Sequence, residues 1–391
     1  MHAASRFAVG LPVRWPLLKL LERAYRWQYP RRSKRQRQAM ARYHGCPDRK
    51  DPRRVRRELR LLARHWGCYP FHYFRYDLFR EGRDLDDRAL LAYIPEFFLY
   101  HVFLPPQEGA GDPAILADKL RTVDLFSARG IAQPAVLGTV VDGRWRGPAG
   151  AAADPQALLA AWSEQAPPRV FLKPAAGSGG HGIIVLRPGD GGWRRSSGEP
   201  VTAADLARLA GAGRWLVQAG VVQVAETARY YPGSVNTFRI NTTVEAGQAK
   251  LRCAVIRIGG GGRELDNAAL GGIMLGVDSA SGLTTAQAGN ELMQSFAQHP
   301  DSGHRFAADA LAVWPEVRAF ALRAAAALPE YTNVAWDIAA TAAGPLALEA
   351  NLGFGIDCYQ SVLGGLAAAF EIDDPAPYWG AGRRRPATMS S

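Results

Sequence analysis

The chain has 391 residues, of which 48% are hydrophobic and 21% are charged, and its formal net charge is +11. This length supports a large core divided into two or three lobes, and the composition excludes an intrinsically disordered chain. No uninterrupted apolar run approaches the roughly 20 residues of a membrane-spanning helix, and Pro12, Arg14 and Pro16 interrupt the early residues where a signal peptide would have its apolar core. The four cysteines have no C-x-x-C spacing and no obvious pairing, so we expect a reducing, cytoplasmic setting.

The positive charge is concentrated near the N-terminus. Residues 31–64 hold 14 lysines and arginines against three acids, a surplus equal to the +11 of the whole chain. Such a block can bind anionic lipid headgroups or nucleic acid, whereas residues 53–64 alone are typical of a solvated amphipathic helix. Nucleic acid is the less favoured partner, because no nucleic-acid module or aromatic stacking array accompanies the charge. Residues 11–29 mix leucine, tryptophan and tyrosine with lysine and arginine, so residues 11–64 are a candidate contact with an anionic membrane surface.

The next part of the chain predicts helices and one short hairpin. Residues 71–104 are rich in aromatic side chains and predict a helical region with breaks. Residues 114–129 predict an amphipathic helix that ends at Gly130. Residues 136–147 predict a hairpin, and the alanine-rich residues 151–165 predict another helix.

A lysine followed by a glycine-rich loop then stands between two apolar strands. Residues 170–186 read V-F-L-K-P-A-A-G-S-G-G-H-G-I-I-V-L, with Lys173 ending the first strand and Gly182 opening the second. The loop matches G-x-G-x-x-G, but a dinucleotide-binding loop must open a helix and a Walker A loop needs Gly-Lys-Ser/Thr, so both are rejected. Backbone amides of a glycine flap can approach phosphates, and an ammonium in an apolar setting requires an anion. A phosphate-binding flap is therefore favoured over an ordinary hairpin with a surface lysine.

Two further strands, at residues 237–244 and 250–258, carry arginines inside apolar runs. A guanidinium in such a position must be paired or must line a cleft. For Arg257 we favour an ion pair within the protein. For Arg239 we favour contact with a transferring phosphate or a substrate carboxylate, with an internal ion pair as the alternative.

Residues 333–351, N-V-A-W-D-I-A-A-T-A-A-G-P-L-A-L-E-A-N, predict a β-hairpin. If its turn is centred on Ala343, Asp337 lies opposite Glu349, and Asn351 shares their face. Like charges so placed repel unless a cation lies between them, and hard oxygen ligands of this kind suit Mg²⁺. The alternative is a solvated edge hairpin whose acids face water.

Together these features resemble the ATP-grasp superfamily: Lys173 with its flap, the strand at 215–218 and the ending Asp337…Glu349-x-Asn351. More narrowly, several short motifs are similar to the sugar-transfer-associated ATP-grasp family, which is related to glutamate-ligase-like proteins. These motifs are F-R-Y at 74–76, D-K at 118–119, S-V-N-T-F-R-I at 234–240, G-G-I-x-x-G-V-D at 271–278 and W-D-I-A at 336–339. The resemblance covers about residues 69–360.

The resemblance implies an α+β ATP-grasp fold, in which two α+β lobes clamp ATP, with an N-terminal basic helical extension. It places the extension at residues 1–68, the first part of the body at 69–168, the lid at 169–225, the C-terminal catalytic lobe at 226–380 and a tail at 381–391.

The same resemblance implies the roles of individual residues. Lys119 and Lys173 would neutralise the ATP phosphates, although Lys119 is equally well explained as a helix-surface lysine. Arg239 would steady the transferred group. Mg²⁺, with Mn²⁺ as an alternative, would be held by Asp337, Glu349 and Asn351. The remaining ATP candidates are the flap residues Gly177, Ser178, Gly179, Gly180, His181 and Gly182 and, for adenine and ribose, Gln218, Gln223 and Glu226. Glutamines stand at two hinge positions where the superfamily commonly has glutamate.

The implied activity is an ATP- and Mg²⁺-dependent ligase that joins a small-molecule carboxylate to an amine through an acyl phosphate, in cell-surface polysaccharide or peptide-conjugate metabolism. A kinase that phosphorylates a small molecule would use the same phosphate machinery. A non-catalytic nucleotide-binding scaffold is the third interpretation, and a complete γ-phosphate site argues against it. The expected location is the cytoplasm, with peripheral attachment to the inner membrane surface as an option.

Overall fold

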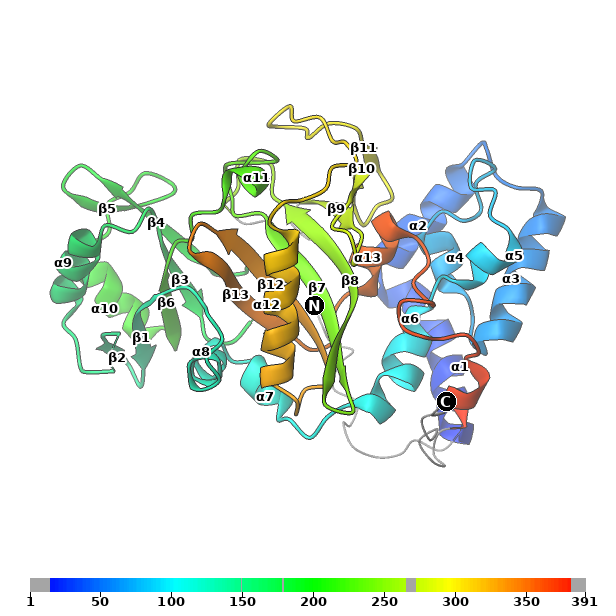
Figure 1. Ribbon diagram of the computed structural model, residues 1–391, viewed down its shortest axis with the longest axis horizontal. Coiled ribbons are helices and arrows are strands. Elements are labelled where there is room, and N and C mark those ends of the chain that lie inside the picture. The colour runs from blue at the N-terminus through cyan, green and yellow to red at the C-terminus, as the bar shows by residue number, and fades with distance from the viewer. Residues whose placement is uncertain (1–14, 149, 178, 265–271, 381–391) are drawn as a thin grey trace. The chain divides into compact units, whose positions relative to one another are not determined.

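The computed structural model describes residues 15–148, 150–177, 179–264 and 272–380, and the chain forms two compact units (Figure 1). Unit 1 comprises residues 1–109, 289–295 and 355–391, and unit 2 comprises residues 110–288 and 296–354. The predicted α+β class is confirmed, because unit 1 is helical and unit 2 contains two largely antiparallel sheets with helices.

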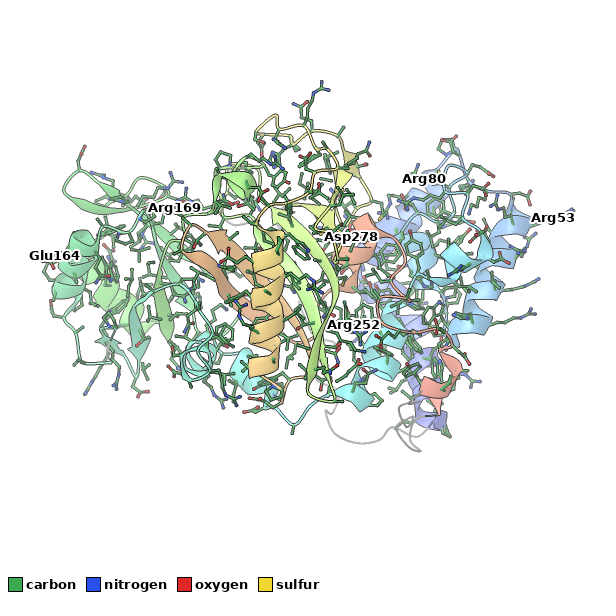
Figure 2. All side chains as sticks on the ribbon, in the orientation of Figure 1. Arg53, Arg80, Glu164, Arg169, Arg252 and Asp278 are labelled. Carbon is green, nitrogen blue, oxygen red and sulfur yellow. The ribbon has the colours of Figure 1, made fainter. Side chains whose placement is uncertain are left out.

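Unit 1 is built from helices, and the basic block supplies two of them. The elements are α1 (Trp15–Arg32), α2 (Lys34–Gly45), α3 (Pro52–Trp66), α4 (Phe71–Arg75), α5 (Asp87–Leu91), α6 (Glu96–Phe98), the π-helix η1 (Leu99–Phe103), the 3₁₀ helix η2 (Pro105–Gln107), α13 (Ile356–Leu363) and α14 (Ala376–Trp379). Asp51 caps the start of α3, and Gly67, with a φ of 69°, ends it. This helix buries Val55 and Leu62 while Arg53 extends into solvent (Figure 2), so the predicted amphipathic helix is confirmed.

A buried network of charges lies within unit 1. Arg75, in the F-R-Y motif, pairs with Asp357 and lies 3.9 Å from Glu96. Arg35 also pairs with Asp357, at 2.5 Å, and with Glu291. The motif therefore joins segments far apart in the sequence, and its role within this unit is structural.

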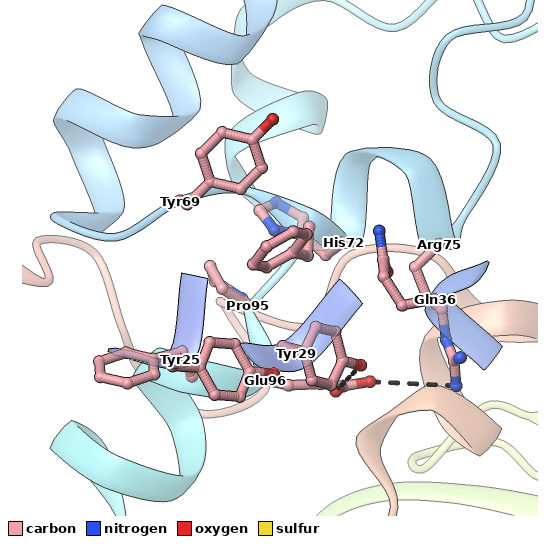
Figure 3. Close-up of a pocket in the computed structure, with 10 residues that line it drawn as sticks. Tyr25, Tyr29, Gln36, Tyr69, His72, Arg75, Pro95 and Glu96 are labelled. Atoms are coloured by element: carbon pink, nitrogen blue, oxygen red, sulfur yellow. Dashed lines mark hydrogen bonds and ion pairs between the residues drawn. The ribbon is translucent and has the colours of Figure 1, made fainter. Parts of the chain in front are cut away.

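A small polar cavity lies beside this network (Figure 3). Gln36 and His72 line it, both are buried, and their side-chain nitrogen and oxygen atoms have no hydrogen-bond partner among the described residues. Burial lowers the pKa of His72 to about 3, which keeps the ring neutral. The cavity volume, about 10 Å³, is close to that needed for one water molecule, which is the partner that these groups require.

The first sheet of unit 2 carries the glycine flap. Its six strands lie in the order β2 (Arg144–Arg146), β1 (Val136–Val141), β6 (Trp215–Ala219), β3 (Val170–Pro174), β4 (Ile184–Gly189) and β5 (Gly192–Arg195). Helices α9 (Pro155–Gln165) and α10 (Ala203–Gly211) pack on it through a core that includes Trp162 and Leu206 (Figure 1). Because β1 and β2 belong to this sheet, the lobe that carries the flap includes strands from before residue 169.

The second sheet of unit 2 carries the candidate metal hairpin. Its strands lie in the order β11 (Ser295–Phe296), β10 (Thr284–Gly289), β9 (Ile273–Val277), β8 (Gln248–Ile258), β7 (Thr237–Glu245), β12 (Asn333–Thr341) and β13 (Gly344–Asn351). Helix α12 (Trp314–Ala327) lies along one face (Figure 1), where Val317 and Ala321 join a core with Trp336 and Ile338. Alternation along β12 therefore turns Asp337 to the other face.

The helix predicted at residues 114–129 is broken in two. The two pieces are α7 (Pro113–Leu116) and α8 (Lys119–Ala128). A separate short helix, α11 (Ala225–Ala228), lies later in the chain. The prediction of one continuous helix is wrong, because the Asp118 carboxylate accepts hydrogen bonds from the backbone of Leu120 and Arg121 and so starts a new helix. Gly130 follows the end of α8 with a φ of 65°, as predicted.

Two further sequence expectations can be compared with the described residues. None of the helices there combines the length and the apolar character needed to cross a membrane. All four cysteines are buried, and none of them is joined to another in a disulfide.

Candidate functional site

A β-bulge sets the position of Glu349. Strands β12 and β13 join through a two-residue turn, Thr341 pairs with Gly344, and this register continues to Ile338 opposite Ala347. A regular ladder would next place Leu348 opposite Asp337. The register shifts there by one residue, so that Asp337 lies opposite Glu349. The predicted pair is confirmed, but it results from the bulge and not from a turn centred on Ala343.

The bulge also decides which face Glu349 occupies. Along β13, Pro345, Ala347 and Ala350 are buried, whereas the consecutive Leu348 and Glu349 are both half-buried. Ala347 and Ala350 belong to the core beneath α12. Without the extra residue, Glu349 would continue the phase of Ala347 and point into that core. With it, Glu349 shares the open face of the sheet with Asp337.

Asp337 is held by two arginines. The carboxylate accepts two hydrogen bonds from one nitrogen of Arg239, at 2.8 and 2.9 Å, and Arg257 lies 3.4 Å away. Asp337 and Arg239 are cross-strand neighbours on β12 and β7, which explains the close pairing. Asn351 contributes an amide nitrogen 3.4 Å from the same carboxylate. The ion pair expected of Arg257 is confirmed, and Arg239 makes the ion pair that was its alternative assignment.

Lys119 extends from the start of α8 toward the flap and the hairpin. Its ammonium donates to the carbonyl oxygen of Gly177 at 2.7 Å and lies 4.0 Å from the Glu349 carboxylate. The backbone amide of Lys119 donates to Ala175 at 2.8 Å, which fixes α8 against the strand that leads into the flap. Lys119 therefore contacts the flap and lies near Glu349, and it is not simply a lysine on a helix surface.

Lys173 lies next to this cluster, on β3. Its ammonium donates to the side-chain oxygen of Gln218 on the neighbouring strand β6, at 2.8 Å. Burial lowers the pKa of Lys173; Glu349 and Asp337 act in the opposite direction, and the Lys119 charge adds to the lowering. A buried ammonium with a lowered pKa gains stability when an anion arrives. Two lysines and two carboxylates, from both sheets of unit 2 and from α8, thus lie close enough to influence one another.

The flap connects β3 to β4. Its glycines Gly177, Gly179, Gly180 and Gly182 all have positive φ values, of 124°, 71°, 73° and 76°. Side chains other than glycine rarely adopt this backbone, so the glycines are required by the loop's shape. His181 is exposed. The candidate Ser178 lies outside the described residues.

The two other nucleotide candidates are engaged elsewhere. Gln223 donates to the carbonyl of Ser234 at 2.7 Å and accepts from the amide of Asn236 at 2.9 Å, so it holds the loop before β7 in place. Glu226 accepts hydrogen bonds from the amides of Ala312 and Val313, at 2.8 and 3.0 Å, directly before α12. Glu226 therefore caps a helix. Its assignment to ribose, like that of Gln223, stays a prediction without a structural contact behind it.

The side-chain oxygens of Asp337, Glu349 and Asn351 are of the chemical type that Mg²⁺ prefers. Among the described residues, no group of three or more His, Cys, Asp or Glu side chains is arranged to hold a metal. The predicted set instead combines two carboxylates with an amide, and Mg²⁺ takes few protein ligands because water and phosphate oxygens complete its octahedron. The Glu349 side chain is 39% exposed and open to a cation. Asp337 would become available when Arg239 turns away from it.

One contributor was missed at the sequence level. Asp118 orients Lys119 by capping α8, and its carboxylate also pairs with Arg214 at 2.6 Å. An aspartate directly before a helical run is a recognised N-cap signal, so the D-K pair could have been interpreted as a cap followed by a positioned lysine.

Comparison with solved structures gives distant matches. The chain is 13% identical to the biotin carboxylase domain of 2-oxoglutarate carboxylase from Hydrogenobacter thermophilus, described as a complex with MgADP, ADP and bicarbonate, with 70% of this chain and 47% of that chain covered and a TM-score of 0.38. It is 14% identical to biotin carboxylase from Campylobacter jejuni, covering 70% and 48% with a TM-score of 0.40. It is 12% identical to D-alanyl-alanine synthetase A from Vibrio cholerae, covering 68% and 62% with a TM-score of 0.39. The chain spans about half the length of the first of these.

A search of curated proteins finds no match. The model of the family described as sugar-transfer associated ATP-grasp matches residues 110–368, which is more than half of the chain and includes every candidate site residue. The F-R-Y motif lies outside this match, in keeping with its structural role in unit 1. The chain therefore belongs to the sugar-transfer associated ATP-grasp family.

Proposed function

We propose that the protein is an ADP-forming ligase that uses ATP and Mg²⁺ to join a small-molecule carboxylate to an amine. One observation supports this proposal: Lys119 and Lys173 lie beside Glu349 and Asp337, so groups suited to phosphate and groups suited to a cation adjoin each other. Arg239 lies next to them on β7. Phosphoryl transfer depends chiefly on positioning and charge neutralisation, and this cluster supplies both.

The proposed reaction has two steps. A carboxylate oxygen of the first substrate attacks the γ-phosphorus of ATP, ADP leaves, and an acyl phosphate results. The nitrogen of the amine then attacks the acyl carbon, inorganic phosphate leaves, and the nitrogen loses a proton to give an amide. No protein nucleophile is needed in either step.

Each residue of the cluster has a defined part in this proposal. Lys119 and Lys173 neutralise the ATP phosphates beneath the flap. Glu349, Asp337 and Asn351 would hold Mg²⁺, or Mn²⁺ in its place, and the metal would supply positive charge at phosphate oxygens. Arg239 exchanges its contact with Asp337 for the carboxylate or acyl phosphate of the substrate, since a guanidinium binds both kinds of anion through the same nitrogens.

The family description supports a role near sugar transfer. We place the reaction in cell-surface polysaccharide or peptide-conjugate metabolism, in the cytoplasm, where ATP is available. ATP and Mg²⁺ are proposed for this chain from its residues and its family, in keeping with the MgADP named for the Hydrogenobacter carboxylase domain.

The test is incubation of the protein with Mg²⁺, ATP and a cytoplasmic small-molecule extract, followed by measurement of ADP and inorganic phosphate. A ligase releases the two in equal amounts, and both depend on the extract. A kinase releases ADP without phosphate, and that result would move the protein to the kinase alternative.

A further inference from the structure

Helix α1 presents an unusual outer face. Seven large apolar side chains are exposed in the part of the chain that the structure describes, and three of them lie on this one helix: Leu17, Leu20 and Trp27, which are 49%, 58% and 62% exposed. The other four are scattered over the rest of the chain, at Val222, Leu283, Leu292 and Leu352. Such a concentration on one element indicates a surface that contacts something apolar.

The spacing places these side chains on a single stripe. Leu17, Leu20, Ala24, Trp27 and Arg31 follow one another at intervals of three and four residues, which is the repeat of one helix face, and all five are exposed. We call these five residues the α1 stripe. The guanidinium of Arg31 lies over the Trp27 ring at 4.4 Å, so the stripe ends in a paired aromatic and cation.

The opposite face of α1 is fastened to unit 1. Leu18 is buried, Tyr25 packs against Phe71 and Phe97, and the hydroxyl of Tyr29 donates to Glu96 at 2.5 Å. One face of the helix therefore packs on unit 1, and the α1 stripe is its exposed face.

The charges around the stripe have one sign. Arg23, Arg26, Arg31 and Arg32 are exposed on the same helix. Its single acid, Glu22, accepts a hydrogen bond from the backbone of Tyr69 and is thus used inside unit 1. A second copy of this basic surface would be repelled, whereas an anionic lipid surface offers the opposite charge together with an apolar layer.

We propose that the α1 stripe lies in the headgroup region of an anionic membrane, with Leu17, Leu20 and Trp27 entering the acyl boundary and the flanking arginines binding lipid phosphates. A helix with leucine and tryptophan on one face and arginines beside them binds such an interface in its plane, without spanning it. The surface brings the enzyme to a lipid-borne or membrane-adjacent substrate and is independent of the reaction chemistry.

The test is cosedimentation of the full chain with two kinds of vesicle, one of phosphatidylcholine alone and one with roughly 30% phosphatidylglycerol. We expect binding to the anionic vesicles only, weakened by added salt. L20Q and W27Q should each lower the partition coefficient about tenfold, because each removes one large apolar side chain from the interface. L283Q, which changes a leucine that is 44% exposed in unit 2, is the matched control and should bind normally.

The charge contribution is tested in the same assay by R23Q combined with R31Q. This variant should lose most of the preference for anionic vesicles, whereas R208Q, at an exposed position on α10, should keep it. Unchanged thermal midpoints of the variants show that binding, not folding, has been altered. Absence of vesicle binding by the unmodified chain, or equal binding by L20Q and L283Q, overturns the proposal, as does self-association through the stripe without lipid binding.

Discussion

Glu349 and Asp337 face each other across the hairpin, yet substitution of Asp337 is expected to destabilise the fold and substitution of Glu349 is not. The Glu349 side chain is 39% exposed, and it pairs with Lys119 at 4.0 Å. Pairs of this kind contribute about 1 kcal/mol or less. E349Q should therefore keep a nearly normal thermal midpoint, while turnover falls at least about hundredfold because a carboxylate ligand of the proposed Mg²⁺ is lost.

Asp337 is different because two guanidinium groups pair with it. Its side chain is 5% exposed, Arg239 is 13% exposed and Arg257 is 18% exposed. D337N leaves both arginines without their shared carboxylate, and breaking a buried ion pair from one side costs about 3–5 kcal/mol. We expect D337N to lower the thermal midpoint clearly as well as to abolish turnover.

The two variants are compared by thermal unfolding and by ADP release with Mg²⁺, ATP and a small-molecule extract. A fully active E349Q would refute the assignment of Glu349 to the site. Equal destabilisation of both variants would refute the distinction between Glu349, which is partly exposed, and Asp337, which pairs with two arginines.

Four further predictions follow from the geometry. ATP affinity should fall as pH rises through the lowered pKa of Lys173, with a midpoint below the ordinary 10.5, and calorimetry of K173R, which stays charged, should show no such fall. R239K should lower turnover about hundredfold with ATP affinity nearly unchanged, because lysine lacks the planar fork that binds an acyl phosphate; an equal loss of ATP affinity would contradict this role. E226A should lower the free energy of unfolding by about 1 kcal/mol through loss of the α12 cap, and a parallel loss of ATP affinity would instead support the ribose assignment. Burial and the Asp357 charge raise the pKa of Glu291 to about 7, so the folded protein binds more protons there than the unfolded chain does; stability should fall as pH rises from 4.5 toward 7, and E291Q should flatten the curve of thermal midpoint against pH.

Local patterns in the sequence predicted the elements of the site well. Alternation along residues 333–351 gave both strands, and the glycines after Lys173 gave the flap, since each pattern depends on neighbours in the chain. The bulge at Leu348 could not be predicted this way, because no residue there demands an extra position. It follows from the core beneath α12, which accepts Ala347 and Ala350 but not Glu349.

Features that depend on distant segments were not foreseen. Arg35 and Arg75 meet Asp357 across most of the chain's length, and no periodic pattern links them. The pairing of β1 with β6, which enlarges the flap-bearing sheet, depends in the same way on tertiary contacts. The hydrogen-bond partners of Glu226 lie far along the chain, directly before α12, and no local pattern in the sequence reveals them.

Amide formation is tested most directly by mass spectrometry of a cytoplasmic small-molecule extract treated with the protein, Mg²⁺ and ATP. We expect a new species formed from two extract components with loss of water, accompanied by ADP and phosphate, and absent with E349Q. A new species that retains the phosphoryl group, formed by the unmodified protein, would contradict the ligase and establish a kinase.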